Sequence, residues 1–372
     1  MKRIILCADG TWNDPERKDE VTGRPHPTNV LKVARAVLPR ARDGVEQVVY
    51  YHTGVGTGGW LDKYTGGAFG DGIEKNIREI YRFLVYNFAP EDELFLFGFS
   101  RGAFTVRTLA GFMKFVGLLK KDDEFYTADL YDLYAHGTKS DSPEWADAFR
   151  NIKERRPCPK IRFLGVWDTV GSLGPPGILG RLHPNKYKYH DVELNDYIEN
   201  AFHALAIDER RVPFKPSIWK KSGTWAGRLE QVWFPGVHSN VGGSYRPDGL
   251  ANEALHWMVE KAEGLGLEFD TTYLGHYLPC FNSNLNDSMT TVYKLLGEYL
   301  RPLGQYIHDG EMVHKSVTDR IALKECNYTP SNASDTTLKG MPIADTARIH
   351  RGTPCEPFVP GKPETRTPSS VR

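Results

Sequence analysis

The stretch FLFGFSRGAF, residues 95–104, decides the fold class of this chain. It joins an apolar run, typical of a buried strand, to a largely apolar helical segment through the pattern Gly-x-Ser-x-Gly. In that context the serine lies on a sharp strand-to-helix turn that raises its hydroxyl above the edge of a sheet. Glycines are expected at 98 and 102 because larger side chains would collide with the neighbouring strand and helix. The stretch therefore predicts a nucleophile at Ser100.

Away from this stretch, short apolar runs alternate with longer segments of helical periodicity. Nearly continuous apolar runs are typical of strands covered on both faces of a parallel sheet. Helices between them imply right-handed crossovers. We therefore predict an α/β fold: a doubly wound, mostly parallel sheet of the α/β-hydrolase type, with helical and loop insertions as caps. The predicted strands are 4–8, 47–51, 93–99, 161–167 and 231–234. The predicted helices are about 29–38, 71–89, 101–119 and 250–264.

One hydrolase domain is expected over residues 1–350. Two stretches break the alternation of strands and helices, and we interpret them as cap insertions near 120–156 and 172–200. Residues 351–372 contain five prolines among Thr and Ser residues. Such a composition cannot bury enough apolar surface to fold, so a mobile tail is predicted there.

Charge and hydropathy exclude several classes of protein. Lys plus Arg and Asp plus Glu both number 47, so no overall attraction to nucleic acid is expected. No apolar run reaches the roughly 18 residues typical of a membrane-spanning helix, so no integral membrane segment is expected. The apolar run 4–8 is too short for a signal peptide. The five cysteines lie far apart and form no CxxC, which favours a reducing compartment and a cytoplasmic location.

Two residues downstream of Ser100 are the candidates for the other members of a catalytic triad. A serine nucleophile needs a base, and the base needs an orienting acid. In α/β-hydrolases the chain order is Ser, then Asp or Glu, then His. Asp168 and His238 have this order, and each directly follows a predicted strand or its short exit turn. His203, which we interpret as part of a helix, and His256 lack this placement and are expected to be structural.

Acyl transfer also needs backbone N–H groups that stabilise the oxyanion. One is expected from Arg101, the residue after the nucleophile, and a second from Gly10 or Thr11, which follow the first strand. No cofactor and no metal is required by this chemistry. The glycine-rich run 54–59 matches Gly-x-Gly-x-x-Gly, but no helix begins directly after it. A rim loop is therefore favoured there over a dinucleotide site.

Two other functions remain open at this point. In a metal-dependent phosphohydrolase, Asp9, Asp168, His238 and Asn240 would gather round a cation. Against this, the Asp expected two residues before Asp9 in such enzymes is Cys7. Alternatively, the hydrolase fold serves as a binding module without catalysis, because a fold alone does not determine function.

Six motifs occur together in an order that is similar to that of a known family. They are DGT at 9–11, GVGT at 54–57, GFSRGA at 98–103, FLGVWDTVG at 163–171, AFHALAIDERR at 201–211 and WFPGVHS at 233–239. The chain, over roughly residues 1–270, resembles the α/β-hydrolase family that includes the catalytic domain of type VI secretion lipase effectors of the first class.

The resemblance implies an α/β-hydrolase fold, a triad of Ser100, Asp168 and His238, and phospholipase activity on a lipid or other small ester. It also implies export by a signal-independent secretion system, with an immunity or secretion protein as partner. One position departs from the family, which often has Asp two residues after the histidine. This chain has Asn240 there, so a role of that residue in binding metal is in doubt.

Overall fold

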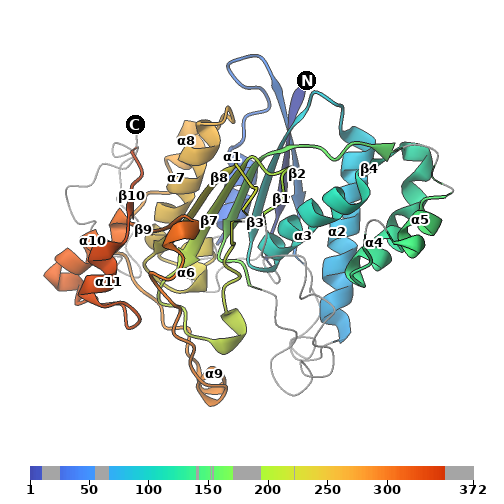
Figure 1. Ribbon diagram of the computed structural model, residues 1–372. Helices are drawn as coiled ribbons and strands as arrows, with labels where there is room; N and C mark the ends of the chain where they lie inside the picture. Colours follow the sequence, from blue (N-terminus) through green and yellow to red (C-terminus); the bar gives the residue numbers. More distant parts are fainter. Residues whose placement is uncertain are drawn as a thin grey trace.

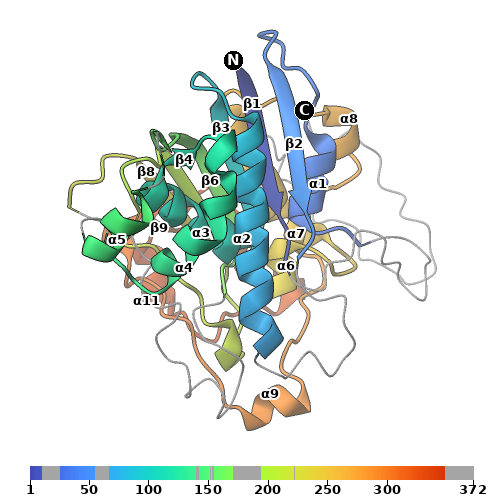
Figure 2. The same ribbon diagram turned by 90° about the vertical axis from the view of Figure 1, so that its right-hand side faces the viewer.

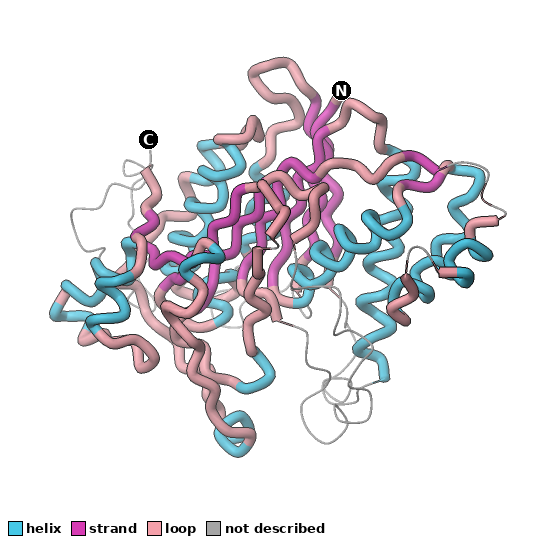
Figure 3. Tube along the Cα trace, viewed as in Figure 1, coloured by secondary structure: helices cyan, strands magenta, loops and turns pink. Residues whose placement is uncertain are grey.

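The computed structural model describes residues 1–10, 26–54, 67–139, 142–150, 152, 155–170, 194–221 and 223–347. Within these ranges an eight-stranded parallel sheet forms the centre of the molecule, with the strand order β10-β9-β8-β7-β6-β3-β1-β2 (Figures 1 and 3). The strands are β1 (Lys2–Ala8), β2 (Glu46–His52), β3 (Glu93–Phe99), β6 (Ile161–Trp167), β7 (Asn200–Ala206), β8 (Arg228–Phe234), β9 (Glu311–His314) and β10 (Ile343–Ala344). The predicted α/β class is therefore confirmed.

Helices cover both faces of the sheet. One face is covered by α2 (Gly67–Asn87) and α3 (Arg101–Val116), and the other by α1 (Asn29–Ala36) and α7 (Gly249–Glu263) (Figures 1 and 2). The chain moves outward from β1 to β2 and then crosses back to β3 on the other side of β1. This reversal makes the β1–β3 boundary the topological switch point, where open α/β sheets bind their ligands.

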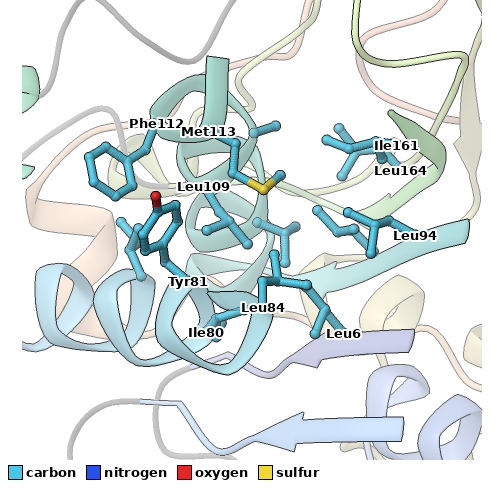
Figure 4. Packing of buried hydrophobic residues seen from close by; sticks show 14 of the residues in the cluster. Leu6, Ile80, Tyr81, Leu84, Leu94, Leu109, Phe112, Met113, Ile161 and Leu164 are labelled. Carbon is cyan, nitrogen blue, oxygen red and sulfur yellow. The ribbon is translucent and has the colours of Figure 1, made fainter. Parts of the chain in front are cut away.

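Alternation of side chains along the strands explains the two covered faces. In β1, Ile4 and Leu6 point to one hydrophobic cluster, while Ile5 and Cys7 point to the other. Because consecutive side chains of a strand lie on opposite faces, a continuous apolar run requires cover on both sides. Figure 4 shows the packing on the α2 and α3 face, with labels on Leu6, Ile80, Tyr81, Leu84, Leu94, Leu109, Phe112, Met113, Ile161 and Leu164.

The sequence prediction was wrong for β7. The stretch around His203 was interpreted as helical, but residues 200–206 form a strand between β6 and β8. Its alanines suit a helix, yet the strand is buried on both faces between neighbours on either side. Tertiary burial therefore outweighed the local propensity.

The C-terminal part of the chain extends the sheet and adds a third apolar cluster. It contains β9 and β10, which the sequence did not predict, together with α10 (Lys315–Ala322) and α11 (Asp335–Gly340). Trp233, Val313 and Leu338 are buried together in this cluster. The remaining short elements here and before are α6 (His238–Gly242), α8 (Thr271–Leu274), α9 (Thr291–Leu295), η3 (Val212–Phe214), η4 (Ile307–Asp309) and η5 (Lys324–Cys326).

The first predicted cap insertion packs beside the helical layer. It comprises β4 (Leu118–Leu119), η1 (Lys121–Tyr126), α4 (Thr127–Ala135), α5 (Pro143–Ala148) and β5 (Arg155–Arg156). Tyr131 and Tyr134 of α4 join the same core cluster as α2 and α3. Most of the second predicted insertion, 172–200, and the predicted tail, 351–372, lie outside the described residues.

Two further findings concern membrane-spanning helices and the cysteines of the described residues. Across the described ranges, the search for a helix with the length and apolar character of a membrane span found none. Cys280 is disulfide-bonded, whereas Cys7, Cys158 and Cys326 are free thiols. A disulfide differs from the expectation that the cysteines stay reduced, and the compartment stays a prediction.

Candidate active site

The predicted catalytic residues all lie at the carboxyl edge of the sheet, the edge opposite the N-terminus in Figure 1. Ser100 follows β3, Asp168 follows β6, and His238 begins α6 shortly after β8. Parallel strands bring their carboxyl ends to one edge, so three residues far apart in sequence lie at the ends of β3, β6 and β8, with only β7 between β6 and β8. Ser100 is also next to the switch point between β1 and β3.

The backbone at Ser100 makes the sharp turn that its motif predicts. Its φ of 58° and ψ of −119° lie in a region of backbone conformation that residues other than glycine rarely adopt. The Ser100 N–H donates to the Trp167 carbonyl of β6 at 3.0 Å, which ties the turn to the neighbouring strand. Helix α3 begins at the next residue, so the serine lies at a helix N-terminus. Strain of this kind is typical of a functional position.

The flanking glycines allow the close approach of three elements. A Cβ atom on Gly102 would lie 2.1 Å from the Ala8 carbonyl oxygen of β1, and one on Gly98 would lie 2.6 Å from the Ala103 Cα. Both contacts are with backbone atoms, which cannot move aside as a flexible side chain would. The steric role predicted for these glycines is therefore present in the structure.

Replacing Gly102 with alanine is expected to lower the free energy of unfolding by about 1–3 kcal/mol, because the added methyl group forces α3 away from β1. The turn at Ser100 should move with the helix. Thermal unfolding and reactivity of Ser100 report the two effects. Gly340→Ala is the matched control, since nothing lies within 4 Å of a Cβ atom there. An unchanged melting temperature for Gly102→Ala would contradict the packing argument.

Asp168 and His238 form a buried hydrogen-bonded pair. His238 Nδ1 lies 2.6 Å from Asp168 Oδ2, and the two residues are 5% and 0% exposed. An ionised carboxylate can only accept, so Nδ1 carries the proton and Nε2 is left as the basic nitrogen. Burial lowers the pKa of His238, and the bond to Asp168 offsets this only in part. The imidazole is therefore neutral near pH 7, as a general base must be.

Two aromatic rings and a carboxylate hold His238 in place. Its ring lies 4.6 Å from that of Phe99 and 4.9 Å from that of Phe214. Its backbone N–H donates to Glu209 Oε2 at 3.2 Å. Because Phe99 immediately precedes Ser100, the imidazole lies beside the serine turn. Within the described chain no hydrogen bond joins the Ser100 hydroxyl to the ring, as is common before substrate binds.

Two charged residues of the site were missed in the sequence. Arg301 has a fully buried guanidinium that binds both oxygens of Asp168, at 2.5 and 3.0 Å. Glu209 is 1% exposed and accepts two hydrogen bonds from the Arg211 side chain, which holds its pKa at about 2 although burial opposes this. Glu209 lies in the motif at 201–211, so that motif could have indicated it. No motif surrounds Arg301.

The backbone N–H groups predicted to stabilise the oxyanion lie in different surroundings. Arg101 is the first residue of α3, so its backbone N–H lies at the positive end of the helix dipole. The Gly10 N–H donates to Asp9 Oδ1 at 2.7 Å. Asp9 Oδ2 accepts from the hydroxyls of Thr28, at 2.6 Å, and Tyr51, at 2.8 Å. Gly10 thus lies in a loop that a buried carboxylate fixes, while Thr11 lies outside the described residues.

The arrangement does not favour the metal-dependent alternative. Both oxygens of Asp168 are bound by cationic or N–H donors, which a divalent ion would have to displace. Asn240 bonds instead to Asn286, whose side-chain oxygen and backbone N–H lie 2.9 and 3.2 Å away. Among the residues whose placement is given, no three His, Cys, Asp or Glu side chains cluster as metal ligands. Asn240 therefore joins α6 to a loop.

His203 bonds to the backbone of the residue after Asp168, which suits the structural role expected of it. Its Nε2 accepts the Thr169 N–H at 3.1 Å, and burial lowers its pKa to about 3, so the ring is neutral. The glycine-rich run is described only at Gly54, and residues 55–59 lie outside the described chain.

A parallel sheet with a strained serine turn and an Asp–His pair at one edge defines the α/β-hydrolase class of protein. Residues 2–261 match the family described as type VI secretion system phospholipase effector Tle1-like, catalytic domain. This chain belongs to that family. The family resemblance inferred from the six motifs is confirmed.

Similar proteins include one from yeast and two of known structure. The chain is 31% identical to Uncharacterized protein YEL023C of Saccharomyces cerevisiae over 235 residues. The matched region covers 58% of this chain and 32% of the yeast protein. An uncharacterized protein from Pseudomonas aeruginosa aligns with a TM-score of 0.46 at 16% identity, over 73% of this chain and 47% of that one. The Tle1 effector bound to the VgrG spike aligns with a TM-score of 0.41 at 15% identity, over 90% and 82%. The chain thus spans about a third of the yeast relative.

Proposed function

We propose that this chain is a serine ester hydrolase that acts on lipid or other carboxylic esters, in the manner of a phospholipase or esterase. The single observation that carries the proposal is the strained Ser100 turn beside the buried His238–Asp168 pair. Strained backbone of this kind clusters at active sites, which supports a catalytic role for Ser100. Membership of a family described by phospholipase effectors supports an ester as substrate.

In the proposed reaction, Ser100 Oγ attacks the acyl carbonyl while His238 Nε2 takes the hydroxyl proton. Asp168 keeps the proton on Nδ1 and stabilises the imidazolium that forms. The oxyanion accepts from the backbone N–H of Arg101, with Gly10 or Thr11 proposed as the second donor; Gly10 would have to give up its bond to Asp9 Oδ1 to serve. His238 then protonates the leaving alcohol, and water hydrolyses the acyl-enzyme by the reverse sequence. No cofactor enters any step.

The partners and location follow from the family and are also proposals. The family is described by type VI secretion effectors, so we propose a lipid substrate and export by a signal-independent secretion machine. A solved relative is bound to the VgrG spike, which makes a spike or immunity protein the partner to test. A nucleic acid partner is not proposed, because the net charge is zero.

Labelling with a fluorophosphonate probe tests the proposal directly. The reagent reacts with activated serines, so we expect one label per chain, at Ser100, with prior incubation in EDTA having no effect. Mass spectrometry of the digested protein locates the label, and hydrolysis of esters of increasing acyl length identifies the substrate class. A folded chain that takes no label and cleaves no ester would favour the binding module. Activity abolished by EDTA would favour the phosphohydrolase.

A further inference from the structure

Arg301 is a fully buried cation at the site, and none of the six motifs contains it. Its side chain has no exposed surface, and it comes from the segment between α9 and η4. That segment lies beyond residues 2–261, which the family match covers. A part of the chain outside the family's catalytic region therefore reaches the centre of the site.

The Arg301 guanidinium bonds to both oxygens of the Asp168 carboxylate and to two backbone carbonyls, an arrangement that we call the clamp. Nη1 bonds to Asp168 Oδ1 at 2.5 Å and to the Ala206 carbonyl at 2.7 Å. Nη2 bonds to Asp168 Oδ2 at 3.0 Å and to the Phe214 carbonyl at 2.7 Å. The Ala206 N–H adds a bond to Oδ1 at 3.0 Å. A bidentate guanidinium fixes the plane of a carboxylate as well as its charge.

The backbone of Arg301 is fixed as well. Asn332 Nδ2 donates to the Arg301 carbonyl at 3.0 Å and to the Ile207 carbonyl, directly after β7, at 3.1 Å. The C-terminal segment is thus bonded to the end of a central strand, and the guanidinium starts from a fixed point. Side chains held this way are pre-organised for a site.

The clamp determines how Asp168 acts on His238. Oδ2 of Asp168 accepts from both His238 Nδ1 and Arg301 Nη2, so the imidazole shares its acceptor with a fixed cation. Burial alone would raise the pKa of Asp168, but the charge of Arg301 and the bond from His238 outweigh it and hold that pKa well below its ordinary value. A cation bound to the same carboxylate should offset part of the negative field by which Asp168 raises the pKa of His238, as the charge of Arg211 also does.

We propose that Arg301 is a positioning residue: it fixes the Asp168 carboxylate as the acceptor for His238 and keeps the imidazole neutral in the range where it acts as base. The role rests on the proposed serine mechanism. Other titratable groups near the pair are Glu209 and Arg211, whose charges act on His238, and His203 with Arg107 near Asp168. His203 is neutral. Arg211 also lowers the pKa of His238 through its charge, but it is bonded to Glu209, whereas Arg301 bonds to Asp168 itself.

The activity test is the pH profile of kcat/KM for Arg301→Gln. In the wild type the acid limb should have its midpoint below the ordinary histidine value of about 6.5. Without the charge of Arg301, Asp168 should make His238 more basic. The midpoint of the acid limb should therefore move to higher pH by about one unit. Turnover on the plateau should fall by about 100-fold as the carboxylate loses its orientation. A limb that stays at the wild-type pH overturns the proposal.

Two further variants separate positioning from stability. Arg301→Lys keeps the charge but lacks the planar pair of nitrogens that fixes the carboxylate plane, so its acid limb should stay near that of the wild type while turnover falls. Full turnover in this variant overturns the proposal even if the Gln variant does not fold. Arg320→Gln is the matched control, because Arg320 is also buried and donates to two backbone carbonyls, those of Phe281 and Ser283. An equal pH shift in the control would overturn a specific role for Arg301.

A measurement without substrate distinguishes this inference from the proposed function. NMR titration of carbon-labelled histidines in the Ser100→Ala chain, with the signal assigned by His238→Gln, gives the pKa of His238 directly. Adding Arg301→Gln should raise that value by about one unit. If the value rises although the wild-type chain cleaves no ester, the contact of Arg301 with Asp168 acts as inferred and the proposed function fails. If the wild-type chain is active and the value does not rise, the proposed function stands and the role of Arg301 is overturned.

Discussion

Replacing Ser100 with alanine is expected to lower ester turnover by about 10⁴- to 10⁶-fold, because members of a catalytic triad act as a unit. The fold should survive the change. Ser100 is 9% exposed, and the bond that ties the turn to β6 comes from its backbone N–H, which alanine keeps. Far-UV circular dichroism and the melting temperature should match those of the wild type, while the initial rate on the preferred ester falls to near background.

The control for this prediction is a serine far from the sheet edge. Ser142 caps α5 in the helical layer, where its hydroxyl accepts from the Trp145 N–H. Ser142→Ala should keep full turnover and full fluorophosphonate labelling. Turnover within tenfold of wild type for Ser100→Ala, in protein free of contaminating esterase, would remove Ser100 from the mechanism. It would leave the strained turn without a catalytic explanation.

Asp168→Asn is expected to have two large effects at once. Turnover should fall by about 10⁴-fold, because a neutral amide no longer selects the reactive tautomer of His238. The free energy of unfolding should also fall, by about 3–5 kcal/mol, because the buried Arg301 loses its counter-ion. Kinetics and denaturant unfolding at pH 7 measure the two effects.

The pH dependence of this stability has a definite sign. Since the folded pKa of Asp168 is held below its ordinary value, the ion pair contributes above about pH 4 and is lost only as the pH falls further. The difference between Asp168→Asn and the wild type should therefore be complete at pH 7 and shrink in acid.

His238→Gln separates the two effects of the Asp168 variant. It removes the base, so turnover should fall about as far, but it leaves the Asp168–Arg301 pair intact. Its loss of stability should be clearly smaller than that of Asp168→Asn. If the two variants were equally destabilised, the ion pair would contribute little, and the cost assigned to an unpaired buried arginine would be wrong.

The amino-acid sequence by itself determined the fold class and where the candidate site lies. Short, continuous apolar runs between helical segments favour strands covered on both faces, and Gly98 and Gly102 leave room for the sharp turn at Ser100, where a Cβ atom would meet backbone. The carboxyl ends of parallel strands share one edge, so Asp168 and His238 could be placed near Ser100 without coordinates. The strands, the turn and the shared edge depend on the local order of apolar residues and glycines and on the direction of the chain, both of which can be read from the sequence.

Only the tertiary structure decided the role of the C-terminal segment. Arg301 meets Asp168 across 133 positions of sequence, and nothing near it distinguishes it from an exposed arginine. The assignment of residues 200–206 to a strand, and of Asn240 to a loop contact, likewise depends on neighbours that are distant along the chain. The physical reason is the same in each case. Burial and charge pairing are properties of the surroundings, and those surroundings exist only once the chain has folded.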